Sequence, residues 1–372
     1  MQARDRLNFW LVIVALSCAG FFCQQAFALS VTFINPGRSD EAYWVAAGRA
    51  VVAAADDLGI HHEQFFAERD HLRVLEIARS IAARPKEQRP DYVMLTNDKL
   101  TLVAAVHILS PAGIKTFGAF SGLQDTERAE FGGPRTGFPL LIGTLEPRSI
   151  DAGYLTASSL IAQGLRMNLQ GPDGKLHLIS VAGDRSTPTS LYRNLGLRRA
   201  LAEHPEVVLD QQVFGDWRRD KAAEQTAWLL RRHPDARLIW SASDQMTFGA
   251  MDALEKQGLQ PGRDVLLSGI NTSTEAMQAV ISGRLAALAG GHFMAGAWAM
   301  VMIYDYEHGH DFADEGIELN KTMFTLFDKP ATAERFLKRF GTGAIPVDFK
   351  HASKVLNPAR KYYDFDFDRL LK

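Results

Sequence analysis

Cysteine is nearly absent from this sequence. The 372 residues include two cysteines, Cys18 and Cys23, and both lie near the N-terminus. From Leu29 onward, no side chain can form a disulfide or act as a thiolate nucleophile. The chain is long enough for two domains of ordinary size, each with a hydrophobic core of its own. We therefore expect packing, rather than covalent cross-links, to stabilise the fold.

A strong excess of charge of either sign is also missing. Lys and Arg together number 41 and Asp and Glu 43, which gives a formal net charge of -2. Unspecific attraction to nucleic acid needs a basic excess, and acidic tracts are typical of disordered tails. The sequence has neither, so we expect a globular protein without a nucleic-acid partner.

Motifs for catalysis and for metal binding are absent as well. No Gly-x-Ser-x-Gly elbow, Walker loop or Gly-x-Gly-x-x-Gly loop follows a predicted strand. The His61-His62 and His308-Gly309-His310 runs lack the i, i+4 helical spacing of a metal site. A secreted hydrolase would need a nucleophile and base pair that the sequence does not show. We predict a protein that is not an enzyme and holds neither a metal nor a cofactor.

Long apolar runs are confined to the N-terminus. Arg4 and Arg6 precede an apolar run at residues 9–22, which is short for a membrane span. Small residues then stand where a signal peptidase reads, at Ala26-Phe27-Ala28. The sequence predicts a cleaved signal peptide over residues 1–28, with an uncleaved anchor as the alternative. The residues before each cysteine match a lipobox poorly, so both cysteines belong to the signal.

Beyond residue 28, short apolar strands alternate with helices, and this pattern predicts an α/β fold with parallel sheets flanked by helices on both faces. The predicted strands are residues 29–34, 64–66, 92–96, 115–120, 140–144, 176–181, 207–214, 238–241, 265–270, 285–289 and 321–327. The predicted helices are residues 42–58, 71–84, 100–109, 151–167, 189–203, 217–232, 245–257, 274–282, 293–308 and 331–339. Residues 122–137 form a polar, irregular insert, and aromatic and acidic residues alternate over the tail 361–368.

The stretch from His177 to Ala202 shows how this alternation builds a ligand site. An apolar strand breaks at Gly183-Asp184, passes through a Ser/Thr/Pro loop and continues as a helix. In open parallel sheets, such loops at the carboxyl ends of the strands form the ligand crevice. Arg193 lies about one turn into the helix, where its fork of donors can reach a bound polar molecule. The alternative is a surface arginine paired with Asp184.

The chain from Leu29 to the low 320s resembles the type I periplasmic binding proteins of the ribose- and galactose-binding kind, a broad group that includes the autoinducer-2 receptor. The residues that carry the resemblance are DRSTPTSLYRNLG at 184–196, WSASD at 240–244 followed by FGAMDAL at 248–254, SGIN at 268–271 and SGR at 282–284. Repressors of the same fold begin with a helix-turn-helix. Here a signal peptide takes that place.

The resemblance implies two Rossmann-like lobes joined by three hinge crossings, with the ligand in the cleft between them. The crossings would fall near residues 143–146, 290–292 and 322. The N-terminal lobe would contain residues 29–144 and 293–320. The C-terminal lobe and tail would contain residues 145–292 and 321–372.

The resemblance also implies a set of ligand-binding residues. Aromatic rings suit the C–H faces of a sugar, and Tyr43, Trp44 and Trp217 match the aromatic positions, with burial in the core as the alternative for the first two. Polar groups at the matching positions would orient the ligand: Ser121, Arg193, Asp244, Asn271 and His292.

Several of these polar residues depart from the family pattern. Ser243 precedes Asp244 where the family usually has Asn, and Asn271 stands where the family usually has Asp. His292 or Gly291 falls where a Gln is common, and Ser121 replaces an acidic and basic pair. An unpaired buried donor costs about 1–3 kcal/mol, so this pocket will not satisfy the hydroxyl pattern of a simple pentose or hexose. An anionic or less hydroxylated ligand is the open alternative.

The function that follows is capture of a small polar ligand, sugar-like or related, in the periplasm and its delivery to an ABC-type membrane permease. The alternative is a periplasmic sensory subunit that presents its ligand state to a membrane histidine kinase or cyclase. In either role we expect a monomer.

Overall fold

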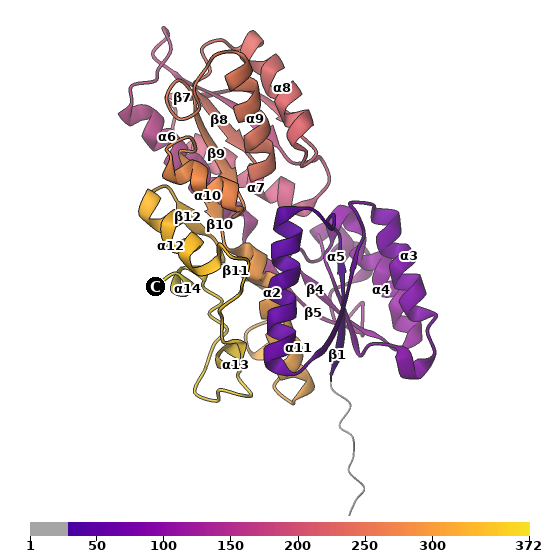
Figure 1. Ribbon diagram of the computed structural model, residues 1–372. Coiled ribbons are helices and arrows are strands. Elements are labelled where there is room, and N and C mark those ends of the chain that lie inside the picture. The colour runs from indigo at the N-terminus through magenta and orange to yellow at the C-terminus, as the bar shows by residue number, and fades with distance from the viewer. Residues whose placement is uncertain (1–28) are drawn as a thin grey trace, which may run out of the picture.

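The computed structural model describes residues 29–372, and these residues build two lobes, each around a six-stranded sheet (Figure 1). The predicted signal peptide, with Cys18 and Cys23, lies outside the described residues. The α/β prediction is confirmed because strands and helices alternate along the chain and the sheets are parallel apart from one edge strand. Among the described residues, no helix combines the length and the apolar character that crossing a membrane requires.

The first sheet has the strand order β11-β5-β4-β3-β1-β2, and all of its strands are parallel. In chain order the strands are β1 (Ser30–Asn35), β2 (His61–Phe66), β3 (Tyr92–Leu95), β4 (Lys115–Ala119), β5 (Leu141–Pro147) and β11 (Glu318–Lys321). The helices α2 (Ala42–Leu58) and α11 (Ala295–Glu307) pack together on one face, and α3 (His71–Ala82) and α4 (Leu102–Leu109) pack together on the other (Figure 1).

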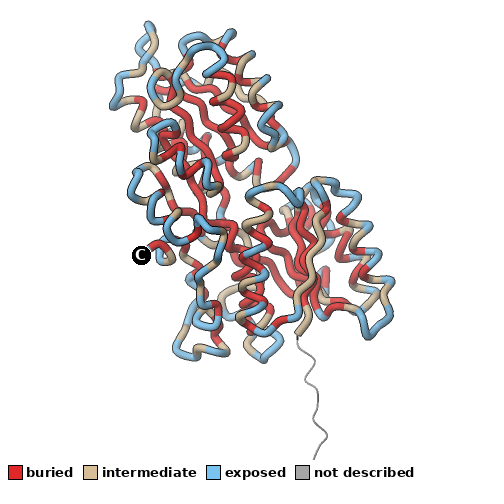
Figure 2. Tube along the Cα trace, viewed as in Figure 1, coloured by how far each residue is buried: buried red, intermediate tan, exposed pale blue. Residues whose placement is uncertain are grey.

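The second sheet has the order β12-β10-β9-β8-β6-β7. Its strands are β6 (Leu176–Ala182), β7 (Val207–Phe214), β8 (Leu238–Ser241), β9 (Leu266–Ile270), β10 (Ala287–Gly290) and β12 (Thr325–Phe327). The helices pack in pairs: α6 (Ser149–Arg166) with α7 (Pro188–Ala202), α8 (Arg219–Arg232) with α9 (Asp244–Lys256), and α10 (Thr274–Ile281) with α12 (Pro330–Phe340). Figure 2 shows that the strands at the centre of each lobe are buried, as expected for sheets covered on both faces.

Local signals in the sequence set several helix ends. Asp70 caps α3, because its side chain accepts a hydrogen bond from the backbone N–H of Leu72 at 2.9 Å. Gly59 ends α2 in the left-handed conformation, with φ 68°, which costs a glycine little. Both ends were predicted from the sequence.

Two segments differ from the prediction. The insert 122–137 contains a helix, α5 (Asp125–Phe131), where irregular structure was expected. The Glu127 carboxylate stabilises its start by accepting from the backbone N–H of Gln124 at 2.8 Å, and so polar residues with no apolar periodicity still form a helix. The predicted strand 321–327 is in fact two strands, because the chain leaves the first sheet after Lys321 and joins β10 antiparallel in the second.

The C-terminal tail also differs from the expected assignment, because it contacts both lobes. The short helix α13 (Phe349–Ala352) packs on α2 and α11, and Asp305 of α11 accepts hydrogen bonds from the backbone N–H of Lys354 and the hydroxyl of Tyr363, both at 2.8 Å. The final helix, α14 (Phe367–Leu370), returns to the second lobe, where the Thr325 hydroxyl donates to Asp368.

Candidate functional site

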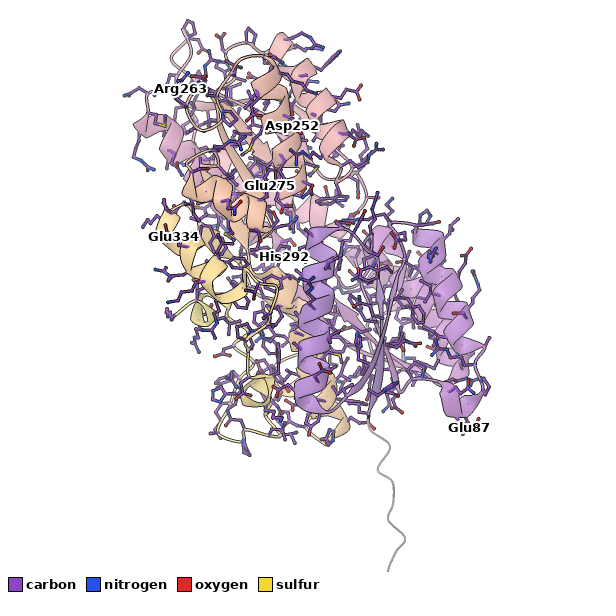
Figure 3. All side chains as sticks on the ribbon, viewed as in Figure 1. Glu87, Asp252, Arg263, Glu275, His292 and Glu334 are labelled. Atoms are coloured by element: carbon purple, nitrogen blue, oxygen red, sulfur yellow. The ribbon has the colours of Figure 1, made fainter. Side chains whose placement is uncertain are left out.

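A cavity between the two lobes collects all eight residues that the sequence singled out. It encloses about 730 Å³ of space free of atoms, part of it open to solvent. The predicted residues on its wall are Tyr43, Trp44, Ser121, Arg193, Trp217, Asp244, Asn271 and His292. Figure 3 shows His292 between the lobes. That these residues bind a ligand is still a prediction.

The strand order explains why residues far apart in sequence meet here. The carboxyl ends of parallel strands share one edge of a sheet, and the loops after them form the crevice. Ser121 follows β4 on the first sheet. Trp217, Asp244 and Asn271 follow β7, β8 and β9 on the second, and His292 follows β10. The two sheets turn these edges toward one cavity.

Several of these loops contain a residue with an unusual backbone conformation. Phe120, Trp217 and Asn271 have positive φ angles of 69°, 62° and 107°. Such conformations cost non-glycine residues on the order of 1–3 kcal/mol each and gather at ligand sites. All three residues line the cavity, so part of the strained backbone of the described residues lies at this site.

Two glycines make room for the two tryptophans of the cavity. A Cβ atom on Gly37 would lie 2.1 Å from Cδ1 of Trp44, and one on Gly183 would lie 2.3 Å from Cζ2 of Trp217. Trp217 is also held by its indole Nε1–H, which donates to Oδ2 of Asp184 at 2.8 Å. The alternative of a surface ion pair between Asp184 and Arg193 is wrong, because Arg193 is buried and its hydrogen-bond partners are Ala242 and His292.

Arg193 is buried, with 3% of its surface exposed. Its Nη1 donates to the carbonyl of Ala242 at 2.7 Å, and its Nη2 donates to Nε2 of His292 at 2.9 Å. The guanidinium carbon also lies 5.7 Å from the ring centre of Trp217, within cation–π range. Burial lowers the pKa of Arg193 to about 10, so the side chain stays charged at neutral pH.

His292 lies in the short helix η4 (His292–Met294), between β10 of the second sheet and α11 on the first lobe, in a stack of rings. Its ring centre is 4.7 Å from that of Tyr43 and 4.5 Å from that of Phe324. Arg193 can only donate, so Nε2 of His292 accepts and the ring proton of the neutral form is on Nδ1. Burial, together with the charge of Arg193, holds the pKa of His292 well below its usual value, so the ring is neutral.

Asp244 supplies a buried carboxylate on the second lobe. Its Oδ1 accepts from Nδ2 of Asn271 at 2.9 Å and from the backbone N–H of Gln245 at 2.8 Å. Burial raises the pKa of Asp244, and these hydrogen bonds oppose that shift.

Sequence reasoning missed the charged residues on the first lobe. Arg69 donates from Nε to Glu41 at 2.9 Å and lies 3.9 Å from a carboxylate oxygen of Asp98, and all three side chains line the cavity. Burial raises the pKa of Asp98, and the charge of Arg69 opposes that shift. One signal could have found two of them: Arg69 and Asp98 each follow a strand of the parallel sheet within a few residues.

The two lobes also touch directly at the cavity. The hydroxyl of Thr187, just before α7, lies 3.3 Å from Oδ1 of Asp98, and the Tyr192 hydroxyl lies 3.4 Å from Oε1 of Gln124 on the first lobe. Thr187 also donates to Asp184 of its own lobe. The two lobes thus approach each other on the side of α5 and α7. Within residues 29–372, no group of three or more His, Cys, Asp or Glu side chains is placed to hold a metal ion.

Comparisons with known proteins agree with this geometry. Residues 31–311 match the family model described as periplasmic binding protein domain. The crystal structure of a periplasmic sugar-binding protein from Pseudomonas fluorescens superimposes with a TM-score of 0.82 at 36% identity, over 92% of this chain and all of that one.

Curated relatives match over shorter stretches. The ribose import binding protein RbsB of Salmonella typhimurium is 32% identical over 110 residues, which are 30% of this chain and 36% of that protein. A xylitol-binding protein of Mycolicibacterium smegmatis is 25% identical over 146 residues, 39% of each chain. The matched stretches thus span little more than a third of these relatives' length.

Proposed function

This chain belongs to the periplasmic binding protein family, and on that premise we propose that it captures a small polar solute, sugar-like or related, in the periplasm and delivers it to an ABC-type membrane permease. The observation that carries the proposal is the cavity itself, because strand-end loops from both lobes line it together. A solute that contacts both walls stabilises the closed arrangement of the lobes, in which Thr187 meets Asp98.

The side chains of the cavity suit such a solute. Trp44 and Trp217 offer apolar ring surface, which fits the C–H faces of a small polar molecule. Arg193 and Asp244 offer a charged donor and a charged acceptor from the same lobe. The described contacts of the cavity residues include no nucleophile activated by a base, so the cavity suits binding and release of an unchanged molecule rather than its conversion. The similar proteins are named as a ribose import binding protein, a xylitol-binding protein and a periplasmic sugar-binding protein, and these names support the same class of solute.

Tryptophan fluorescence tests the proposal. Purified protein is titrated with a panel of monosaccharides, sugar alcohols and sugar acids, and binding is expected to change the emission of Trp44 and Trp217. In Trp217→Phe the change shrinks, whereas in Trp228→Phe it persists, because Trp228 on α8 is 53% exposed and does not line the cavity. A panel that leaves the emission and the melting temperature unchanged throughout would refute capture of a small polar solute.

Delivery to a permease has its own test. The expected result is that saturating solute increases binding of the protein to detergent-solubilised permease, because closure brings both lobes into the arrangement described. Binding that is equal with and without solute, combined with binding to a sensor kinase that depends on solute, would favour the sensory role. That role and the monomeric state are still predictions.

A further inference from the structure

Arg193 is a buried cation without a carboxylate partner among residues 29–372. Its two hydrogen bonds go to uncharged acceptors, the Ala242 carbonyl and the His292 ring. A guanidinium has five N–H donors, so three stay unused, and Nε is buried with no partner in the described chain. Buried charges in proteins are normally paired, because an uncompensated one is costly. The site therefore has one positive charge that nothing in this lobe neutralises by direct contact.

The other unpartnered polar atoms of the cavity can also donate. The indole Nε1 of Trp44, Nδ1 of His292 and the hydroxyl of Ser121 are each buried and without a hydrogen-bond partner among the described residues. The indole only donates, and Nδ1 of His292 carries the ring proton, since Arg193 occupies Nε2. Together with Nε of Arg193, these atoms are hydrogen-bond donors on the cavity wall that lack a partner, and acceptor atoms of a ligand would satisfy them.

The carboxylates of the cavity, by contrast, are already engaged. Glu41 and Asp98 face Arg69, and Asp244 accepts from Asn271 and Gln245. A carboxylate keeps acceptor capacity beyond two hydrogen bonds, so these walls still accept from ligand hydroxyl groups. The cavity thus combines acceptors for hydroxyl hydrogens with a concentrated, unneutralised donor set around Arg193.

We propose that the solute is a polyhydroxy carboxylate, such as an aldonic or uronic acid, whose carboxylate pairs with Arg193 while its hydroxyl groups face Asp244 and the first lobe. This inference rests on the proposed function and names the ligand class of the same site. A carboxylate supplies the missing counter-charge and matches the fork of the guanidinium. The low pKa of Arg193, about 10, has the same origin, because burial without a contacting anion disfavours the charged form.

Calorimetric titration of the purified full chain with matched pairs tests this assignment. The pairs are D-galactose with D-galacturonate, D-glucose with D-gluconate, and D-ribose with D-ribonate, all at pH 7.5. In at least one pair we expect the acid to bind at least tenfold more tightly than the neutral sugar. If every binding pair favours the neutral sugar, or shows no preference, the acid assignment is wrong and solute capture stands. If no member of any pair binds, the acid assignment fails, and so does the proposed capture of sugars and sugar acids.

Variants at Arg193 add a second measurement, the preference for the acid over its neutral partner, which a purely structural role of Arg193 would not change. In Arg193→Gln the acid should lose at least tenfold in affinity and the preference over its neutral partner should vanish. In Arg193→Lys, which keeps the charge and loses the fork, part of the preference should remain. The matched control is Arg69→Gln on the opposite wall, which should weaken both partners alike because Arg69 is paired with Glu41. An acid preference that survives in Arg193→Gln contradicts the assignment.

Discussion

Gly183 lies directly beneath the indole ring of Trp217, and replacing it with alanine tests whether that ring holds the solute. The alanine Cβ would lie 2.3 Å from Cζ2 and 2.4 Å from Cη2 of the ring, and 2.8 Å from Oγ of Ser190. Carbon atoms pack at about 3.5–4.0 Å, so the indole must move by roughly 1 Å or more. Gly183 does not have a positive φ, so the substitution adds bulk without backbone strain.

The magnitude follows from the contact that the shift breaks. Trp217 donates from Nε1 to the Asp184 carboxylate at 2.8 Å, and a hydrogen bond to a charged group contributes about 1.5–3 kcal/mol. Because this hydrogen bond is already present in the unliganded protein, Gly183→Ala should lower the free energy of unfolding by up to about 3 kcal/mol. The displaced ring also leaves the position in which a solute would contact it, so solute binding should weaken by at least about tenfold, which corresponds to about 1.4 kcal/mol.

Calorimetry with the best-binding solute, alongside thermal unfolding, measures both effects. The matched control is Gly133→Ala, since a Cβ there would meet its nearest atoms at 3.7 and 3.9 Å, which is ordinary contact. An unchanged affinity in Gly183→Ala would refute the reasoning that Trp217 must occupy this position to bind. A loss of stability well above the contribution of this hydrogen bond, about 3 kcal/mol, would instead identify Trp217 as a structural residue.

Three further predictions concern the first lobe, the tail and the pH dependence of stability. Gly37→Ala should displace Trp44, which it would meet at 2.1 Å, and calorimetry should show at least a tenfold loss of affinity. Asp305→Ala should destabilise the protein by about 3 kcal/mol or more, measured by urea unfolding, because it leaves the buried donors of the tail without their acceptor. The ring Nδ1–H of His177 donates to the carboxylate of Asp210 at 2.8 Å, and this hydrogen bond raises the pKa of His177 above its usual 6.5. The stability from this pair should therefore be complete below about pH 6.5 and should be lost as pH rises through the raised value, and His177→Gln should flatten that dependence.

Much of the cavity could be predicted because strand-end loops are visible in the sequence. The apolar strand before Gly183 and the helix after it placed Arg193 at the carboxyl edge of a parallel sheet, where the structure has it. Trp217 and Asp244 were expected at the cavity from the family resemblance, and both line it. The strands could be located because buried parallel strands appear in a sequence as short, continuous apolar runs.

Other features depended on contacts that no local pattern reveals. Arg69 and Asp98 lie in polar turns, and the pairing of Arg69 with Glu41 and with Asp98 emerges only once β1, β2 and β3 are side by side. Helix α5 has no apolar periodicity by which it could be predicted. Its stabilisation by Glu127, which accepts from the backbone N–H of Gln124, cannot be distinguished in the sequence from an ordinary polar segment. The tail shows alternating aromatic and acidic residues, but this alternation does not indicate that Asp305 of α11 accepts a hydrogen bond from Tyr363.

The central claim, that the two lobes close on one solute held by both, can be measured directly as an interlobe distance. Because the chain lacks cysteine from Leu29 onward, cysteines introduced at Leu72 and Trp228, exposed residues of the first and second lobes, can carry spin labels without ambiguity. Pulsed electron spin resonance should show a broad distance distribution without solute that collapses to one shorter, narrow peak at saturation. A distribution that stays unchanged while calorimetry shows full binding would contradict the account.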